Sequence, residues 1–260
     1  MTKKMKDYCM IEIRDIDVTF DFTSDIKDYW NHYWTVDPIM GHGNEDPDCK
    51  SKTLQFYHKI IYSKTLPNGK EMQLQCGSGA NYLNWNGMRF GSDSICASFR
   101  YEKYRGMIEK ISKTVPNWHQ FIENYVHRSY TLGGEIIFPK MPGGINQTRG
   151  FNRQICDRWD LTLECIRRYY IGLPSPLTDV LEKNRDFFEL FVDFKGYVDY
   201  FYLQDCVTSD YSKVIIWTKD EPFTKDPLPK TEETYLSFIS EELCFVDKRN
   251  KRIHDEICKQ

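Results

Sequence analysis

The chain has 260 residues, an aromatic content of 15% and a formal net charge of −3. This length allows one large domain or two small ones, and the apolar content can build a sizeable core, which excludes a disordered chain. The net charge excludes a protein that coats nucleic acid through a broad positive field, but it leaves a local basic pocket open.

The sequence predicts neither a signal peptide nor a membrane span. The N-terminal stretch MTKKMKDYCMIEIRD is basic, but no apolar segment of a signal peptide follows it. No run approaches the ~18 apolar residues of a spanning helix. The nine cysteines include no C-x-x-C pair, which favours reduced, mostly buried thiols over a zinc ribbon or a disulfide framework. We therefore expect a soluble, cytoplasmic protein.

The first hundred residues are predicted to be rich in β-strands. In CMIEIRDIDVTFDF (residues 9–22) apolar residues alternate at period two with one slip near Asp15, which predicts an extended strand. DIKDYWNHYWTV and TLQFYHKIIYSK have helical spacing instead. Short strands are predicted in EMQLQC, NYLNW, MRFG and SICASF, and Asn86-Gly87 predicts a two-residue hairpin turn.

From residue 101 onward the pattern is mainly helical. Helices are predicted in YEKYRGMIEKISKTV, NWHQFIENYVHRSY, DRWDLTLECIRRYY and PLTDVLEKN, and GGEIIFPK is a short extended segment. Residues 185–207 predict one long core helix, KVIIW a short strand, and the residues from Thr231 one charged helix. We predict a single α+β domain over residues 1–260. Its short-stranded antiparallel segment (8–100) packs on a mainly helical remainder (101–260).

The densest polar chemistry lies in INQTRGFNRQICDRWDLTLECIRRYY, residues 145–170. On a helix over residues 157–170, one face is apolar and the opposite face is charged. Glu164 and Arg168 are four residues apart with the acid first, so they are predicted to pair. An amphipathic helix with ordinary ion pairs already explains this pattern.

The residues before that helix add a candidate ligand site. GGINQTRGFNRQ is predicted to be a glycine-punctuated loop that runs towards the helix N-terminus, and helix N-termini and arginines both bind anions. The aspartates of the first turn would repel an anion unless a metal ion lies between. The residues expected to bind a phosphate-bearing ligand are Asn146, Arg149, Asn152, Arg153 and Arg168. The carboxylates expected to hold a divalent metal of unknown identity and to act in catalysis are Asp157, Asp160 and Glu164.

Several long motifs support a family resemblance. SKTLQFYHKIIYSKTLPNG, FGSDSICASF, YTLGGEIIFPK and FFELFVDFKGYVDYFYLQD occur in this order around the polar stretch. Together they resemble an uncharacterised prokaryotic family, a domain of unknown function, from about Phe20 to His254. The resemblance implies a complete stand-alone protein and no particular activity, so it assigns no catalytic residue.

Other motifs carry weaker chemistry. RNKRIH (249–254) fits the R-x4-H pattern of HEPN-type ribonucleases, but a solvated basic helix end is favoured. GHGNEDPDC (41–49) offers metal-type ligands without the spacing of a known loop, which favours a solvated loop. GSDS (91–94) is predicted to be a turn capped by its Asp and Ser. His119 and His127 are two helical turns apart and could share a face as core or surface residues.

Two functions remain open. The first is binding of a phosphate-bearing ligand, a nucleotide or a nucleic-acid end, with metal-assisted phosphoester cleavage as the best-suited chemistry. Arg149→Ala should then abolish binding without unfolding. The second is a non-catalytic protein-interaction module, in regulation or phage–host conflict, that contacts a protein partner through Tyr29, Trp30, Tyr33 and Trp34. A concave, titratable cluster would favour the first function, and an exposed aromatic patch the second.

Overall fold

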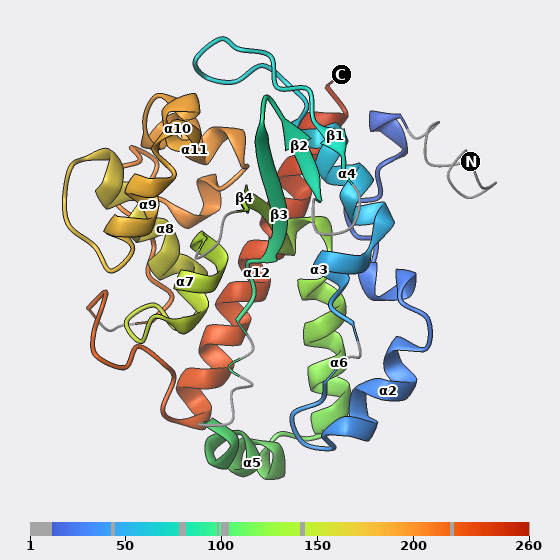
Figure 1. Cartoon of the computed structure of the whole chain (residues 1–260). Coiled ribbons are helices and arrows are strands. Elements are labelled where there is room, and N and C mark those ends of the chain that lie inside the picture. Colours follow the sequence, from blue (N-terminus) through green and yellow to red (C-terminus); the bar gives the residue numbers. More distant parts are fainter. Residues whose placement is uncertain are drawn as a thin grey trace.

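The computed structural model describes residues 12–42, 45–77, 82–97, 99, 104–140, 144–218 and 221–259. A long C-terminal helix, α12 (Glu232–Ile257), runs through the middle of the molecule (Figure 1). The small sheet lies in front of the C-terminal half of this helix, and helices from residues 145–200 lie on one side of it. The buried apolar side chains form one core cluster that draws on residues from Ile16 to Ile257. No helix within the described ranges is long and apolar enough to cross a membrane.

The sheet consists of antiparallel strands in the order β1-β2-β3-β4. Their bounds are β1 (Gln75–Cys76), β2 (Leu83–Trp85), β3 (Met88–Ser94) and β4 (Glu135–Pro139). Asn86 and Gly87 have φ angles of 47° and 79°, which is the backbone that a two-residue type I′ turn requires, so the predicted hairpin is confirmed. β4 pairs with β3 and is buried at every residue. The α+β class with a short-stranded antiparallel segment is confirmed.

Helices form where the apolar spacing predicted them. They are α2 (Tyr29–Val36), α4 (Lys52–Tyr62), α5 (Arg105–Thr114), α6 (Trp118–Ser129), α8 (Trp159–Tyr170) and α9 (Thr178–Lys183). A one-turn helix, α3 (Pro47–Lys50), precedes α4. Asp46 caps α3 by accepting a hydrogen bond from the Asp48 backbone at 3.3 Å, and Pro47 occupies the first turn, where its missing N–H costs nothing.

The N-terminal segment is not the strand that its alternation predicts. Residues 12–25 contain two 3-10 turns, η1 (Ile13–Asp15) and η2 (Phe22–Asp25), and residues 9–11 lie outside the described ranges. The Phe22 N–H donates to the Tyr130 carbonyl at 2.9 Å, and the Leu132 N–H donates to the Val18 carbonyl at 3.2 Å. These two bonds do not extend into a ladder. Alternation of apolar and polar residues shows only that one side of a segment is buried. An irregular extended chain can bury one side in the same way as a strand, so the pattern does not distinguish the two.

The polar stretch also folds differently from the prediction. Residues predicted as a loop form helix α7 (Ile145–Phe151). Asp157 has a φ of 64°, a left-handed conformation that a helix interior does not accommodate, so α8 begins two residues later. The predicted SICASF strand does not extend β3 beyond Ser94.

The predicted long core helix is broken into short pieces. They are α10 (Arg185–Phe188), η5 (Glu189–Phe191), α11 (Phe194–Tyr200) and η6 (Gln204–Cys206). Val192 has a φ of 69°, which ends the helical path, and Asp193 starts α11 by accepting a hydrogen bond from the Gly196 N–H at 2.7 Å. KVIIW contributes an isolated bridge between Val207 and Val214 instead of a strand.

α12 is anchored by a buried arginine. Arg249 is 0% exposed, and its guanidinium donates to the carbonyl oxygens of Gly133 and Glu135, both at 2.8 Å, and of Phe201 at 3.1 Å. Gly133 belongs to the 3-10 turn η4 (Leu132–Gly134), and a Cβ there would lie 2.4 Å from the Val246 carbonyl oxygen. The expectation of a solvated helix end at Arg249 is therefore wrong, because buried carbonyl groups at the start of β4 and after α11 use this arginine as their donor.

The thiols are less buried than expected. Three described cysteines, Cys156, Cys165 and Cys206, are buried, whereas Cys49, Cys76, Cys244 and Cys258 are exposed.

Candidate functional site

Arg149, the central residue of the predicted ligand site, lies inside the protein. It is 0% exposed, and its Nη1 lies 2.7 Å from Asp93 Oδ2 and 3.1 Å from Asp157 Oδ1. The same guanidinium donates to the Ser94 carbonyl at 2.9 Å and to Thr162 Oγ1 at 3.1 Å. Arg149 therefore joins α7 to the end of β3 and the start of α8, and its contacts are internal to the fold.

Two of the predicted catalytic carboxylates form separate ion pairs on α8. Asp160 is 0% exposed and accepts a hydrogen bond from Arg158 Nε at 3.0 Å. Glu164 accepts from Arg167 Nε at 2.7 Å and from Arg168 Nε at 2.9 Å, so the predicted pair with Arg168 is confirmed. Burial alone would raise the pKa of Glu164, but the two arginines outweigh it and lower the pKa. These pairs hold α8 in place, and the structure does not bring them to the cleft described below.

The remaining predicted residues divide between two places. Asn152 Nδ2 donates to the Pro176 carbonyl at 3.3 Å, and Arg153 is exposed. Asn146, in contrast, donates to the Ser92 carbonyl at 3.3 Å and lines a cavity beside β3. The predicted set therefore contributes Asn146 and Asp157 to the cleft, with Arg149 beneath it.

Two cavities meet at three aspartates that come from distant parts of the sequence. Cavity A has a volume of about 460 Å³ and cavity B about 650 Å³, and both are lined by Asp46, Asp48 and Asp93. Asp46 and Asp48 belong to the start of α3, Asp93 lies on β3, and α3 packs against β3. We call the two cavities and these three residues the acidic cleft. Their volumes lie in the range of ~300–1,000 Å³ found for small-molecule sites.

Two buried carboxylates have an oxygen without a hydrogen-bond donor among the described residues, and one of them, Asp48, lines both cavities. Asp48 is 7% exposed, and its Oδ1 has no donor among the residues that the structure describes. Glu135, at the start of β4, is 0% exposed, and its Oε1 likewise has no hydrogen-bond donor among the described residues. Its Oε2 accepts a hydrogen bond from Ser92 Oγ at 3.2 Å. Burying such an acceptor is unfavourable unless a proton, a cation or a ligand donor reaches it. At the cleft itself, Asp48 Oδ1 is therefore an acceptor that the described chain leaves unused.

Burial and mutual repulsion raise the pKa values of these carboxyl groups. Burial, followed by the charges of Asp46 and Asp93, raises the pKa of Asp48 well above its ordinary range. Burial and the charges of Asp48 and Asp46 do the same to the pKa of Glu135. Burial raises the pKa of Asp93 to about 7, with Arg149 opposing the increase and Asp157 adding to it. Perturbed titratable groups in a concave site are characteristic of binding and catalytic sites.

The lysines at the cleft lie around cavity B. Lys50, Lys52 and Lys140 are exposed and line this cavity together with Asn146 and Gln147. The described residues that line cavity A include no lysine or arginine. The cleft therefore has an acidic junction and a lysine rim on the side of cavity B. In the lining of cavity A, Asp37 pairs with Arg105, and Asp93 and Asp157 pair with Arg149.

The carboxylates do not form a complete metal site by themselves. Within the described ranges, no group of three or more His, Cys, Asp or Glu side chains is arranged to hold a metal ion. Magnesium has a less demanding mode of binding: it keeps several waters and is held by one or two carboxylates together with substrate phosphate oxygens. The two carboxylates of Asp46 and Asp48 suit this partly hydrated mode of binding better than they suit a site in which protein side chains supply every ligand.

A family model described as "Family of unknown function (DUF6994)" matches residues 16–253. The chain belongs to this family. The match confirms the resemblance to an uncharacterised family over nearly the whole sequence. No curated protein and no solved structure matches the chain. The acidic cleft is therefore interpreted from its own chemistry.

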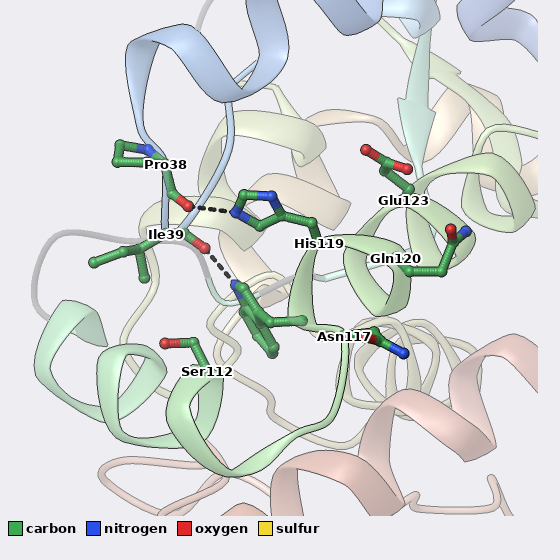
Figure 2. Close-up of a pocket in the computed structure, with 8 residues that line it drawn as sticks. Pro38, Ile39, Ser112, Asn117, His119, Gln120 and Glu123 are labelled. Atoms are coloured by element: carbon green, nitrogen blue, oxygen red, sulfur yellow. Dashed lines mark hydrogen bonds between the residues drawn. The ribbon is translucent and has the colours of Figure 1, made fainter.

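Another pocket, separate from cavities A and B and of about 630 Å³, lies where residues 37–40 meet α6 (Figure 2). Figure 2 shows the imidazole of His119 directed at the carbonyl of Pro38, to which its Nε2 donates at 2.8 Å. Glu123, also on this wall, accepts a hydrogen bond from Trp34 Nε1 at 2.8 Å. These polar groups bind the chain itself, so they fix α2 and the turn after it on α6.

The aromatic residues of α2 face the protein. Both tyrosines of this helix are buried. Trp34 stacks on His119 with 4.0 Å between ring centroids, and Trp30 lies 4.6 Å from His127. The two histidines share one face of α6, as their spacing predicted, and they hold α2 against it. The exposed aromatic patch that would favour an interaction module is not formed by these side chains.

Sequence reasoning identified the segments of the cleft but gave them other roles. GHGNEDPDC was expected to be a solvated loop and GSDS a capped turn, whereas Asp48 is buried and Asp93 pairs with a buried arginine in β3. The one local signal is Pro47, which marks a helix start and thereby makes Asp46 a cap and Asp48 a first-turn residue.

Proposed function

We propose that the acidic cleft binds a phosphate-bearing ligand together with a divalent cation and supports phosphoester hydrolysis. The observation that carries this proposal is the buried, donor-less Oδ1 of Asp48 at the junction of two cavities. Asp46 and Asp93 line the same junction. A divalent cation there would neutralise charges that burial otherwise forces to take up protons.

The lysine rim supports a phosphate in cavity B. Lys140 directly follows β4, and the amides of Asn146 and Gln147 add neutral donors on the α7 side. Lysine and amide donors bind phosphate oxygens, and the remaining oxygens would complete the coordination of magnesium. A nucleotide or a nucleic-acid end is the ligand class that this arrangement suits.

Hydrolysis requires a base and an electrophilic centre. A water oxygen forms a bond to phosphorus, the ester P–O bond breaks, and the departing oxygen takes a proton. Asp46 and Asp48 would hold the cation that polarises the phosphate. The pKa of Asp93 is about 7, so in this scheme it accepts the proton of the attacking water at neutral pH and returns it to the departing oxygen.

The first test is thermal unfolding with Mg²⁺, with ribose 5-phosphate, and with both. We expect the pair to raise the melting temperature more than either alone, because each completes the binding site of the other. A ligand at ~100 times its Kd adds about 2.7 kcal/mol to the free energy of unfolding. Release of p-nitrophenol from mono- and bis-p-nitrophenyl phosphate tests hydrolysis.

Lys140→Ala should weaken ribose 5-phosphate binding roughly tenfold or more, since a hydrogen bond to a charged group contributes ~1.5–3 kcal/mol. Lys70→Ala removes an exposed lysine that lines neither cavity and should bind as the wild type does. No stabilisation by ribose 5-phosphate, AMP or pyrophosphate in the presence of Mg²⁺ or Mn²⁺ would overturn the proposal.

A further inference from the structure

We infer that Lys64 is a reactive amine that forms an imine with a small carbonyl compound bearing an anionic group, such as a phosphorylated aldehyde. The site is a cavity of about 630 Å³, here called cavity C, which shares no lining residue with cavities A and B. Its lining comes from Lys64, which follows α4, from residues 199–205 and from the second half of α12. Its chemistry is independent of the proposed phosphoester hydrolysis.

The amine of Lys64 is enclosed by two tyrosine rings. Its Nζ donates a hydrogen bond to the Tyr200 carbonyl at 2.9 Å and lies 4.6 Å and 4.0 Å from the ring centroids of Tyr200 and Tyr202. The two tyrosines are buried, so their rings are fixed parts of the wall. Within the described ranges no carboxylate forms an ion pair with this amine. The ammonium therefore lacks the partner that would hold its proton most strongly.

This environment makes the neutral amine accessible near neutral pH. Burial lowers the pKa of Lys64 to about 8, while the charge of Glu256 opposes the decrease and the charge of Arg249 adds to it. At pH 7.5 roughly a quarter of the amine is then neutral, against about one part in a thousand for an ordinary lysine. A desolvated lysine with a lowered pKa is the kind of nucleophile that forms imines with carbonyl compounds.

Imine formation needs no oxidant or reductant. The amine nitrogen forms a bond to the carbonyl carbon, and the carbonyl oxygen takes the proton that the nitrogen releases. The hydroxyl group then leaves as water with the second nitrogen proton, and a C=N bond remains. The protonated imine is a cation like the ammonium that it replaces, so the rings of Tyr200 and Tyr202 stabilise it as well.

The α12 wall of cavity C provides charge for an anionic group on the ligand. Lys248 and Lys251 line the cavity, are exposed and form no ion pair within the described ranges. The four carboxylates of the lining each have a basic neighbour, in the pairs Asp199–Lys195, Asp205–Arg252, Glu256–Lys259 and Asp255–His254. A phosphate or carboxylate group of the ligand would therefore meet two lysines that no acidic side chain already occupies.

Gln204 independently indicates that cavity C takes a ligand. It lines the cavity, and its buried Oε1 has no hydrogen-bond donor among the described residues. Its Nε2 donates to Asp199 Oδ1 at 2.9 Å, which fixes the amide. A buried acceptor of this kind is unfavourable unless a water or a ligand donates to it. A hydroxyl group on the ligand would satisfy this oxygen.

Pyridoxal 5′-phosphate is a suitable probe because it joins an aldehyde to a phosphate, and pyridoxal is the matched compound without the phosphate. Each is incubated with the full chain, the imines are reduced with sodium borohydride, and mass spectrometry of peptides locates the modified lysines. Lys70 is the internal control, because it is exposed, lies six residues further along the chain and lines none of cavities A, B and C. The double variant Lys248→Ala/Lys251→Ala tests the anionic group.

We expect pyridoxal 5′-phosphate to modify Lys64 at least about tenfold faster than Lys70 at pH 7.5. The rate at Lys64 should level off above about pH 8, where that at Lys70 still rises. The double substitution should slow modification of Lys64 by pyridoxal 5′-phosphate about fivefold and leave modification by pyridoxal unchanged. Equal modification of Lys64 and Lys70, or preferential modification of Lys140 in cavity B, would overturn the imine site. A Lys64-to-Lys70 ratio that is the same for both aldehydes would overturn the anionic-group assignment.

Discussion

Replacing Arg149 by alanine is expected to lower the free energy of unfolding by about 3–5 kcal/mol, the usual effect of removing one partner of a buried ion pair. The substitution leaves the carboxylates of Asp93 and Asp157 without the guanidinium that lies 2.7 Å and 3.1 Å from them. It also removes the donor to the Ser94 carbonyl and so loosens the end of β3. Urea denaturation followed by circular dichroism measures the effect.

Arg153→Ala is the control, because this arginine lies four residues further along the chain and is exposed. Its effect should stay within about 0.5 kcal/mol, as for most surface substitutions. A stable, folded Arg149→Ala protein would instead show that the cleft holds together without this ion pair. The expectation that Arg149→Ala abolishes binding without unfolding does not suit a residue with this burial, and Lys140 is the better probe of phosphate binding.

Local patterns predicted the elements whose formation depends on local properties. The Asn-Gly turn requires two left-handed residues and obtains them, and the amphipathic spacing in α4, α6 and α8 produced helices. The failures have a common cause. Residues 12–25 and 185–206 are apolar enough to be buried, but their regularity is decided by partners elsewhere in the fold and by single residues such as Val192.

The candidate site was predicted only in part because it is assembled across the sequence. Asn146 and Asp157 belong to one polar stretch and both reach the cleft. Asp48 and Asp93 are 45 positions apart by their numbers, and contact between α3 and β3 brings them together. Each of their motifs is consistent with an ordinary loop or turn. The information that distinguishes a site from a loop is their burial beside one another, and no local pattern contains it.

The R-x4-H motif near the C-terminus shows that a local pattern can also indicate a site where the fold forms none. Arg249 and Asn250 fit part of a ribonuclease pattern, but both are buried, and they bind Glu135 at the start of β4 and Thr131 shortly before it. His254 is exposed and lies apart from these contacts as part of the last turn of α12. A pattern of residue types therefore has chemical meaning only when their side chains converge on a cavity.

Asp48→Asn is expected to stabilise the ligand-free protein and to weaken its ligand binding. The folded wild type holds a proton on Asp48 at pH values where the unfolded chain has lost it, because burial raises the pKa of this group. The unfolded state then binds fewer protons, so this group lowers stability as pH rises above about 4. Asparagine has no such titration. The variant should therefore gain stability relative to the wild type between pH 5 and pH 8, by about 1.4 kcal/mol for each unit by which the pKa is raised.

Binding should change in the opposite direction, because an amide cannot replace the charge of a carboxylate beside a cation. We expect AMP affinity in the presence of Mg²⁺ to fall at least about 30-fold, which corresponds to roughly 2 kcal/mol. Asp186→Asn, at an exposed aspartate on α10, should change neither quantity appreciably. If Asp48→Asn gained no stability with pH, Asp48 would be a satisfied structural carboxylate. If it gained stability and kept its affinity for AMP, the cation would be held by Asp46 and Asp93 instead. Stability as a function of pH and AMP affinity together therefore separate the unfavourable burial of the Asp48 carboxylate from its contribution to cation binding.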